Sequence, residues 1–292
     1  MFDFKDRGAF ITGGASGMGL GMAKAFAREG ARVAIGDIRQ DHLDQAIVAA
    51  REEGLELAPF LLDVTDREAF ARVADEAEAA VGPISLVSLN AGIGVLGHIK
   101  DATYDDWDWI LGVNLGGVIN GVRTFVPRLR EHGLGGHVMA TASMGGIVVA
   151  ESGGIYSAAK FGVVTMMQCL RDDLTRDGIG VSVLCPAAVN TNIHEHYGMR
   201  PAIFGDSSYS QTEEEVQGLK NMLQRGMTPD QVGEIVVQGI RDNRLYIMTH
   251  PAPAVVAQRR DALLASLPDE PKNEARWQAD LAARRMMNER LA

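Results

Sequence analysis

The stretch AFITGGASGMGLGMAKAFAR, residues 9–28, decides the fold. A short apolar strand runs into the glycine-rich run TGGASGMG at Thr12–Gly19, and an amphipathic helix follows. Gly13 allows a tight turn, Gly17 lets the backbone approach a pyrophosphate, and Gly19 permits close packing of helix on strand. The N-terminus of the helix then faces the phosphates. This order predicts a dinucleotide-binding unit; the alternative is a tight turn that holds no ligand.

The rest of the chain continues this alternation of apolar strands and amphipathic helices. Thr65, Thr103 and Thr228 are the expected N-cap residues of three helices, and Pro229 supports the last of them. The alternation predicts an α/β fold, a doubly wound parallel sheet of Rossmann type with about seven strands and helices on both faces. Strands are expected at 9–12, 32–37, 57–62, 84–89, 137–142, 180–185 and 245–248, and helices at 18–29, 41–53, 66–81, 103–131, 154–177 and 229–242.

Two regions depart from this rhythm. Residues 190–226 are polar and irregular and follow the carboxyl end of a strand, so we expect a substrate lid there; the alternative is a solvated insertion with its own short helix. Residues 251–292 suggest two more helices. We therefore expect a dinucleotide-binding catalytic domain at 1–250, which includes the lid, and a helical C-terminal extension of the same domain at 251–292. The sequence leaves open whether this extension contacts its own subunit, the lid or a neighbouring chain.

Composition and charge narrow the class of protein. The 292 residues are 46% hydrophobic with a formal net charge of −10 and no long basic cluster, so nucleic acid is not an expected partner. No apolar run approaches about 18 residues, so no membrane span is expected. The opening MFDFKDRG is too charged for a signal peptide. Cys169 and Cys185 are expected to be buried free thiols, which favours a cytoplasmic protein.

The run YSAAK predicts proton-transfer chemistry. It places Tyr156 and Lys160 one helical turn apart on one face, and Ser143 lies thirteen residues before the tyrosine. A unit charge about 4 Å from a phenol, at an effective dielectric of ~20, supplies about 4 kcal/mol. That is enough to lower a tyrosine pKa from ~10 to ~7. The ordinary alternatives are a strand cap for Ser143 and a core aromatic for Tyr156.

Acidic residues at two strand ends extend the predicted cofactor site. Asp37 ends the second strand about twenty residues beyond the glycine loop, where a carboxylate can accept hydrogen bonds from ribose hydroxyls. It would repel a 2′-phosphate, whereas Arg39 could attract one; we give Asp37 more weight and expect NAD. Asp63 is similarly placed for the edge of the adenine. The alternative for Asp37 is a residue that only shapes the turn.

These motifs together resemble the short-chain dehydrogenase/reductase family. The resemblance covers roughly residues 5–250, with five separated motifs in the right order. One departure is Ala187, where the family has a glycine, and it implies less backbone freedom there. The matching segments are TGGASGMG for the family's TGxxxGxG loop, Asp63-Val64 and Asn90-Ala91-Gly92 for its adenine and sheet-stabilising motifs, Asn114 for its helix asparagine, Ser143, Tyr156 and Lys160 for its catalytic residues, and PAAVNT at 186–191 for its PGxxxT segment.

The resemblance implies four catalytic residues. Tyr156 would be the general base in alcohol oxidation and the acid in carbonyl reduction, and Ser143 would hydrogen-bond the substrate oxygen. Lys160 would bind the nicotinamide ribose and acidify Tyr156, and Asn114 would hold a water in a proton relay to Lys160. The implied residues for binding NAD are Gly13, Ser16, Gly17, Met18, Gly19, Asp37, Ile38, Asp63, Val64, Asn90, Ala91, Gly92, Tyr156, Lys160, Pro186, Val189 and Thr191.

The walls of the substrate pocket are expected at the carboxyl ends of the strands, around the nicotinamide. They are mostly apolar, which favours a bulky hydrophobic or aromatic alcohol or ketone. No metal site is expected, because His194 and His196 stand two apart without a cysteine or an HExxH partner nearby. The expected substrate-binding residues are Val95, Ser143, Met144, Tyr156, Ala187 and His194.

Three stretches give a narrower resemblance, to bacterial Cα-dehydrogenases of lignin-derived β-aryl ethers. They are TYDDWDWILGVNLGGVINGVRTFVPRL from Thr103, NIHE after Thr191, and LYIMTHP from Leu245. Enzymes of this kind oxidise a benzylic secondary alcohol to an aryl ketone with NAD, which implies a role in the degradation of aromatic compounds. The alternatives are a carbonyl reductase of another lipophilic ketone, steroid or cyclic, and a non-catalytic protein that senses a cofactor. Family analogy and the two longest predicted helices imply a homotetramer or a homodimer.

Overall fold

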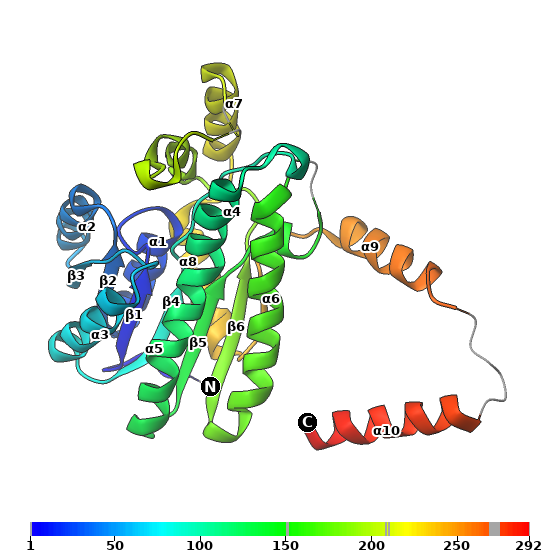
Figure 1. The fold of residues 1–292 in the computed structure, drawn as a ribbon. Helices are drawn as coiled ribbons and strands as arrows, with labels where there is room; N and C mark the ends of the chain where they lie inside the picture. The colour runs from blue at the N-terminus through cyan, green and yellow to red at the C-terminus, as the bar shows by residue number, and fades with distance from the viewer. Residues whose placement is uncertain (1, 150–151, 208, 210, 269–274, 292) are drawn as a thin grey trace. The chain divides into compact units, whose positions relative to one another are not determined.

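One seven-stranded sheet organises Met1–His250, the first of the two units into which the chain divides; the second is Pro251–Ala292. The computed structural model describes residues 2–149, 152–207, 209, 211–268 and 275–291. The strand pairs are all parallel, in the order β3-β2-β1-β4-β5-β6-β7 (Figure 1). The strands are β1 (Gly8–Thr12), β2 (Arg32–Asp37), β3 (Leu57–Leu61), β4 (Ile84–Leu89), β5 (Gly136–Thr141), β6 (Ile179–Cys185) and β7 (Tyr246–Met248).

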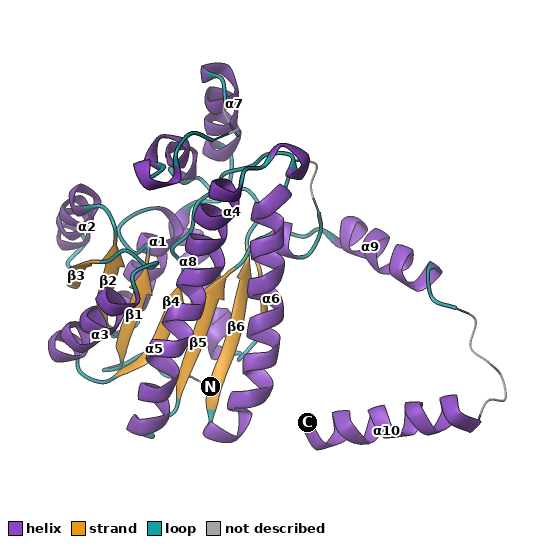
Figure 2. Cartoon of the chain, viewed as in Figure 1, coloured by secondary structure: helices purple, strands orange, loops and turns teal. Residues whose placement is uncertain are grey.

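Helices cover both faces of this sheet (Figure 2). The apolar sides of α3, α5 and α6 pack on one face, and those of α1, α2 and α8 pack on the other. The two layers bury separate hydrophobic clusters, which confirms the doubly wound fold expected from the sequence. The helices of this unit are α1 (Gly17–Arg28), α2 (Gln40–Glu52), α3 (Arg67–Val81), α4 (Tyr104–Leu111), α5 (Gly117–His132), α6 (Gly154–Leu174), α7 (Glu213–Gln224) and α8 (Pro229–Arg241).

The predicted strands agree with the observed ones within one residue at each end. The helix predicted at 103–131 differs, because a π-helical turn at Gly112–Gly116 separates α4 from α5. The side chain of Asn114 lies in this turn and bonds both main-chain polar groups of Ile93, so the widened turn carries a side chain to the sheet edge. The break in the helix is thus a feature of the site.

Two smaller predictions about individual residues were wrong. The N-cap of α3 is Asp66, whose carboxylate accepts from the amides of Glu68 and Ala69, while the hydroxyl of Thr65 donates to Asp63. Cys169 is exposed rather than buried. Thr103 and Thr228 do cap their helices, each in a reciprocal capping box.

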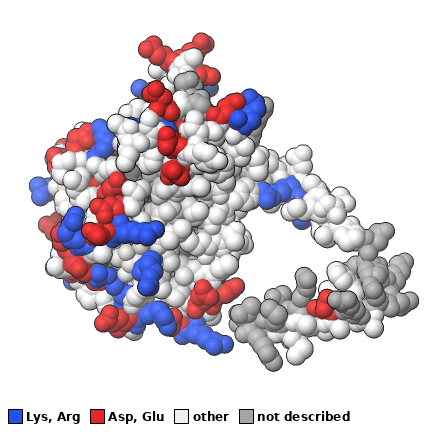
Figure 3. Space-filling view, viewed as in Figure 1, with Lys and Arg blue, Asp and Glu red and all other residues white. Residues whose placement is uncertain are grey.

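The segment expected to form a lid, residues 190–226, leaves the sheet edge and returns to it. Its closure over a substrate stays a prediction, and the name lid refers below to these residues only. A parallel bridge between Val189 and Met227 closes its base. It contains two short 3₁₀ turns, Ile193–Met199 and Ala202–Phe204, followed by α7. The first turn of α7 carries three consecutive glutamates, and acidic side chains gather at the top of Figure 3, where α7 lies.

The second unit consists of α9 (Pro253–Ala265) and α10 (Ala275–Leu291). Both helices were expected from the sequence, and the assignment of this extension to the catalytic domain stays a prediction. Across the part of the chain that the structure describes, no helix is long and apolar enough to cross a membrane.

Candidate active site

The carboxyl ends of β1, β4 and β5 meet at Asn90, directly after β4. Its amide nitrogen donates to the carbonyls of Thr12 and Gly13 at 3.2 Å each, and its amide oxygen accepts from Thr141 Oγ1 at 3.0 Å. Thr12 Oγ1 accepts in return from the main-chain amides of Asn90 and Ala91. One side chain therefore braces three neighbouring strand ends and holds the glycine loop in place.

The glycine loop is too tightly packed for side chains at two of its positions. Gly13 has a φ of +61°, a conformation that other residues rarely adopt. A Cβ at Gly19 would lie 1.9 Å from the carbonyl oxygen of Gly13. The loop thus leads with bare backbone into the N-terminus of α1, a geometry that fits the phosphates of a dinucleotide.

Asp37 lies at the end of β2, beside the glycine loop. Its carboxylate accepts from the main-chain amide of Ala15 at 3.2 Å and from that of Arg39 at 3.1 Å. Burial raises the pKa of Asp37, and these hydrogen bonds lower it in part. The carboxylate therefore links the β2 end to the loop, a position that fits a ribose.

The segment PAAVNT follows β6 and reaches the same loop. A Cβ at Gly17 would lie 3.0 Å from Thr191 Cγ2, so these two motifs touch. Ala187 does not adopt the left-handed backbone conformation that requires glycine, and its amide donates to Thr249 Oγ1 at 3.3 Å. The departure from the family pattern at Ala187 is therefore accommodated without backbone strain.

Ser143 and Tyr156 come together at the carboxyl end of β5. Both side chains lie around Gly145, where a Cβ would be 3.4 Å from Ser143 Oγ and 3.4 Å from Tyr156 Cε1. Ser143 Oγ also accepts from the amide of Gly145 at 3.0 Å, so the serine caps the following turn as well. Burial raises the pKa of Tyr156, and a hydrogen bond with Ser143 lowers it in part.

Lys160 lies one turn beyond Tyr156 on α6 and is 4% exposed. Its Nζ is 5.6 Å from the centroid of the tyrosine ring and donates to the carbonyl of Thr141 at 3.0 Å. Burial lowers the pKa of Lys160 to about 8. Charge at this site therefore depends on pH near neutrality.

Asn114 reaches the same place from the π-helical turn. It is fully buried, and its side chain accepts from the amide of Ile93 and donates to the carbonyl of Ile93, both at 3.0 Å. A Cβ at Gly92 would lie 2.7 Å from Asn114 Oδ1 and 3.3 Å from Lys160 Nζ, so the two side chains converge on this glycine. The structure thus brings all four expected catalytic residues to one edge of the sheet.

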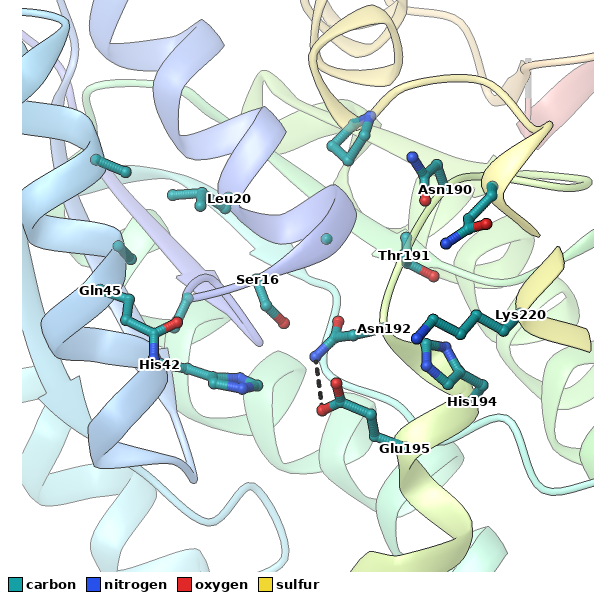
Figure 4. Close-up of a pocket in the computed structure, with 16 residues that line it drawn as sticks. Ser16, Leu20, His42, Gln45, Asn190, Thr191, Asn192, His194, Glu195 and Lys220 are labelled. Carbon is teal, nitrogen blue, oxygen red and sulfur yellow. Dashed lines mark hydrogen bonds between the residues drawn. The ribbon is translucent and has the colours of Figure 1, made fainter. Parts of the chain in front are cut away.

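The expected substrate residues fall into two groups. Val95 is buried in a hydrophobic cluster with residues of α4 and the lid, including Trp109 and Tyr209. His194 instead lines a cavity of about 530 Å³ that adjoins the glycine loop (Figure 4). In that view His194 lies near Lys220 of α7 and Thr191, with Ser16 across the cavity.

Sequence analysis missed the residues that hold the lid. Asp106 of α4 is fully buried and forms an ion pair with Arg200 at 2.8 Å, and it also accepts from Ser207 at 2.6 Å. The guanidinium of Arg200 further donates to the carbonyls of Phe204 and Gly205 and lies 5.3 Å from the Trp109 ring. No spacing rule links positions so far apart, so the only signal in the sequence is the acidic first turn of α4.

His196 was considered in the sequence only as a metal ligand, and it has another role. Its Nδ1 accepts from the amide of Gly94 at 3.2 Å, which joins the lid to the segment after β4. Tyr197 adds a second link, since its hydroxyl accepts from the amide of Leu96 at 2.9 Å. Burial lowers the pKa of His196 to about 4. The described residues contain no group of three or more His, Cys, Asp or Glu side chains that could hold a metal ion.

Known proteins are similar to this chain in sequence and fold. The family model for short chain dehydrogenase matches residues 7–200. C alpha-dehydrogenase of Sphingobium sp. (strain NBRC 103272 / SYK-6) is 44% identical over 252 residues, which cover 86% of this chain and 83% of that protein.

Two solved structures are also similar. LigD in its apo form, from Sphingobium sp. strain SYK-6, has a TM-score of 0.76 and 38% identity and covers 91% of this chain and 99% of its own. A short chain dehydrogenase/reductase from Burkholderia phymatum in complex with NAD has a TM-score of 0.83 and 32% identity, with coverage of 94% and 100%.

Fold, site and comparisons define a Rossmann-type oxidoreductase. The chain belongs to the short-chain dehydrogenase/reductase family, whose members use NAD(P) and act on small molecules.

Proposed function

We propose that this protein is an NAD-dependent dehydrogenase that interconverts a bulky aromatic secondary alcohol and its ketone, and that its substrate is the benzylic alcohol of a lignin-type β-aryl ether. The observation that carries the proposal is the placement of Tyr156 between Ser143 and Lys160 at the sheet edge, beside the glycine loop. The similarity to C alpha-dehydrogenase supports the substrate class.

In the proposed mechanism Tyr156 moves the proton. Its phenolate takes the proton of the substrate hydroxyl during oxidation, and the phenol returns it during reduction. Ser143 donates a hydrogen bond to the substrate oxygen and orients it toward Tyr156. The bound nicotinamide cofactor supplies the chemistry of hydride transfer.

Lys160 has two proposed roles. It binds a ribose hydroxyl, and its charged form favours the phenolate of Tyr156. Because burial raises the pKa of Tyr156 in the protein itself, the phenolate requires positive charge from its surroundings. Asn114 holds the end of β4 and, as proposed, a water that passes protons to Lys160.

NAD rather than NADP is the proposed cofactor. Asp37 already accepts two main-chain amides, and its carboxylate lies where ribose hydroxyls would add to them. A 2′-phosphate at this position would bring a second negative group against a carboxylate.

A panel of alcohols tests the proposal directly. NADH formation is followed by absorbance with aryl-glycerol β-aryl ethers, simple benzylic alcohols, steroid alcohols and cyclic alcohols at matched concentrations. We expect kcat/KM for the aryl ethers to exceed that for the steroid and cyclic alcohols by at least about tenfold, a difference of about 1.4 kcal/mol in transition-state binding. Faster turnover of a steroid or cyclic substrate would instead support a carbonyl reductase, and cofactor binding without turnover of any substrate would support a sensing protein.

A further inference from the structure

Arg39, at the start of α2, is held by two carboxylates, one from its own turn and one from a distant part of the chain. Its Nε donates to Asp41 Oδ1 at 3.0 Å, and its Nη2 donates to the other oxygen of Asp41. Its Nη1 forms an ion pair with Glu195 Oε2 at 3.2 Å, and Glu195 belongs to the lid. The guanidinium is thus engaged on both of its ends, once within its own turn and once by a residue 156 positions away.

The position of Arg39 bears on the choice of cofactor. Its main-chain amide donates to Asp37 Oδ1 at 3.1 Å, so the arginine follows directly on the carboxylate proposed to bind the ribose. An arginine at this point can bind a 2′-phosphate through two parallel hydrogen bonds, but only with free N–H groups. In this structure three of the five N–H groups of the Arg39 guanidinium point to carboxylates, at Nε, Nη1 and Nη2.

We infer that Glu195 and Asp41 form a clamp on Arg39 that, together with Asp37, excludes a 2′-phosphate and so makes the lid a determinant of cofactor choice. The inference rests on the proposed use of NAD. Glu195 is therefore assigned as a specificity residue that acts by positioning Arg39.

Charge supports this assignment. Two carboxylates, Asp41 and Glu195, contact the guanidinium, and Asp37 accepts from the main-chain amide of the same arginine. These three carboxylates and one guanidinium together carry a net charge of −2. A 2′-phosphate brings further negative charge and would have to compete with the carboxylates for the guanidinium of Arg39. A ribose with free hydroxyls carries no charge and needs only acceptors, which Asp37 provides.

The clamp is part of the cofactor side of the lid. Glu195 lines the cavity beside Ser16 and Gly17 of the glycine loop, and Asn192 Nδ2 donates to the same Glu195 oxygen at 3.4 Å (Figure 4). The ion pair with Arg39 therefore joins the turn after β2 to the lid next to the phosphate end of the site.

Binding measurements without substrate test the inference. Dissociation constants for NADH and NADPH are measured by fluorescence titration for the wild type, Asp41→Asn, Glu195→Gln and the double variant. We expect the preference for NADH over NADPH to fall about threefold in each single variant and about tenfold in the double variant, as the charge is removed and the guanidinium is freed.

Two controls isolate the clamp. Asp44→Asn removes the same charge one turn further along α2, where the carboxylate bonds Gln40 instead of Arg39, and it should leave the preference unchanged. The double change is then repeated in an Arg39→Ala background. If the carboxylates act by holding the guanidinium, the gain in NADPH affinity should shrink there to less than a third.

An unchanged preference in the double variant would overturn the clamp. An equal gain with and without Arg39 would also overturn it, because the carboxylates would then act by simple repulsion. Since no substrate is present, a failure of the proposed dehydrogenase activity would show in the alcohol panel and would leave these binding constants unaffected.

Discussion

The floor of the site and its lid are held together by different kinds of contact. The floor is the carboxyl edge of the sheet together with the glycine loop. The side chains of Asn90, Asn114 and Lys160 lie there and bond main-chain atoms at or just after the ends of neighbouring strands. The lid is residues 190–226, and it is joined to the rest of the molecule mainly by side chains that meet other side chains or single amides.

The difference bears on how each region tolerates change. Contacts to the main chain of a parallel sheet keep their geometry as long as the sheet itself folds. Contacts such as Asp106–Arg200 depend on two particular residues, and the loss of one partner leaves the charge of the other without an opposite charge in a place largely shielded from water. We therefore expect substitutions in the floor to lower kcat, and substitutions in the lid to lower the free energy of unfolding and the affinity for substrate.

The largest effect is expected for Tyr156→Phe in the floor. The ring still fills its place, but the exchangeable proton is gone, so kcat should fall by at least about 1,000-fold, about 4 kcal/mol in activation free energy. NADH affinity and thermal stability should stay close to those of the wild type. Steady-state kinetics and NADH titration check this, and near-normal oxidation of a good substrate would refute the mechanism.

The next effect concerns the anchor of the lid. Asp106→Ala leaves the largely enclosed guanidinium of Arg200 without a carboxylate, with only two carbonyls and the Trp109 ring as partners, and should lower the free energy of unfolding by about 3–5 kcal/mol. Urea denaturation measures this loss, and limited proteolysis reports whether cleavage moves into 190–226. Asp105→Ala, an exposed neighbour on the same helix, serves as the matched control and should change little. A loss below about 1 kcal/mol for Asp106→Ala would show that the lid does not depend on this pair.

Acid should lower the stability of the fold through two neutral histidines, His137 within β5 and His196 in the lid. Burial lowers their pKa values to about 3 and about 4, below the ~6.5 of an unfolded histidine. As the pH falls below 6.5 the unfolded chain binds these protons first, so the free energy of unfolding should decline with falling pH. Each histidine should lower the free energy of unfolding by about 2 kcal/mol at pH 5, relative to its value above pH 6.5.

Denaturation curves between pH 6.5 and 5.0 check the slope, because carboxylates stay largely ionised in that window. His196→Gln should remove its share of the slope and leave that of His137. A slope that does not change in this variant would mean that His196 titrates normally in the folded protein.

The smallest effect is expected away from both regions, at the N-cap of α8. Thr228→Ala removes the side-chain acceptor of the Gln231 amide and should lower stability by about 1 kcal/mol without altering cofactor binding. Thr65→Ala is the comparison, because Thr65 precedes a helix but does not cap it. Equal losses in the two variants, measured by thermal unfolding, would contradict the assignment of caps.

Much of the floor was predictable because its residues carry local signals. The glycine loop, the strand-end asparagine after β4 and the YSAAK spacing each describe a turn, a strand end or a helix face within a few residues. Their convergence then followed from parallel strands that end at one edge. The π-helical turn around Asn114 was missed, because its side-chain bonds to Ile93 join residues 21 positions apart.

The sequence by itself determined the doubly wound sheet, its strand positions and the group of residues around Tyr156, because hydrophobic periodicity and glycine spacing are short-range properties. Only the tertiary structure decided which residues hold the lid and which partners surround Arg39. Asp106 and Arg200 are 94 positions apart, and Arg39 and Glu195 are 156 apart. Such ion pairs form because folding brings charged groups from distant segments together, and no local pattern along the chain predicts which groups will meet.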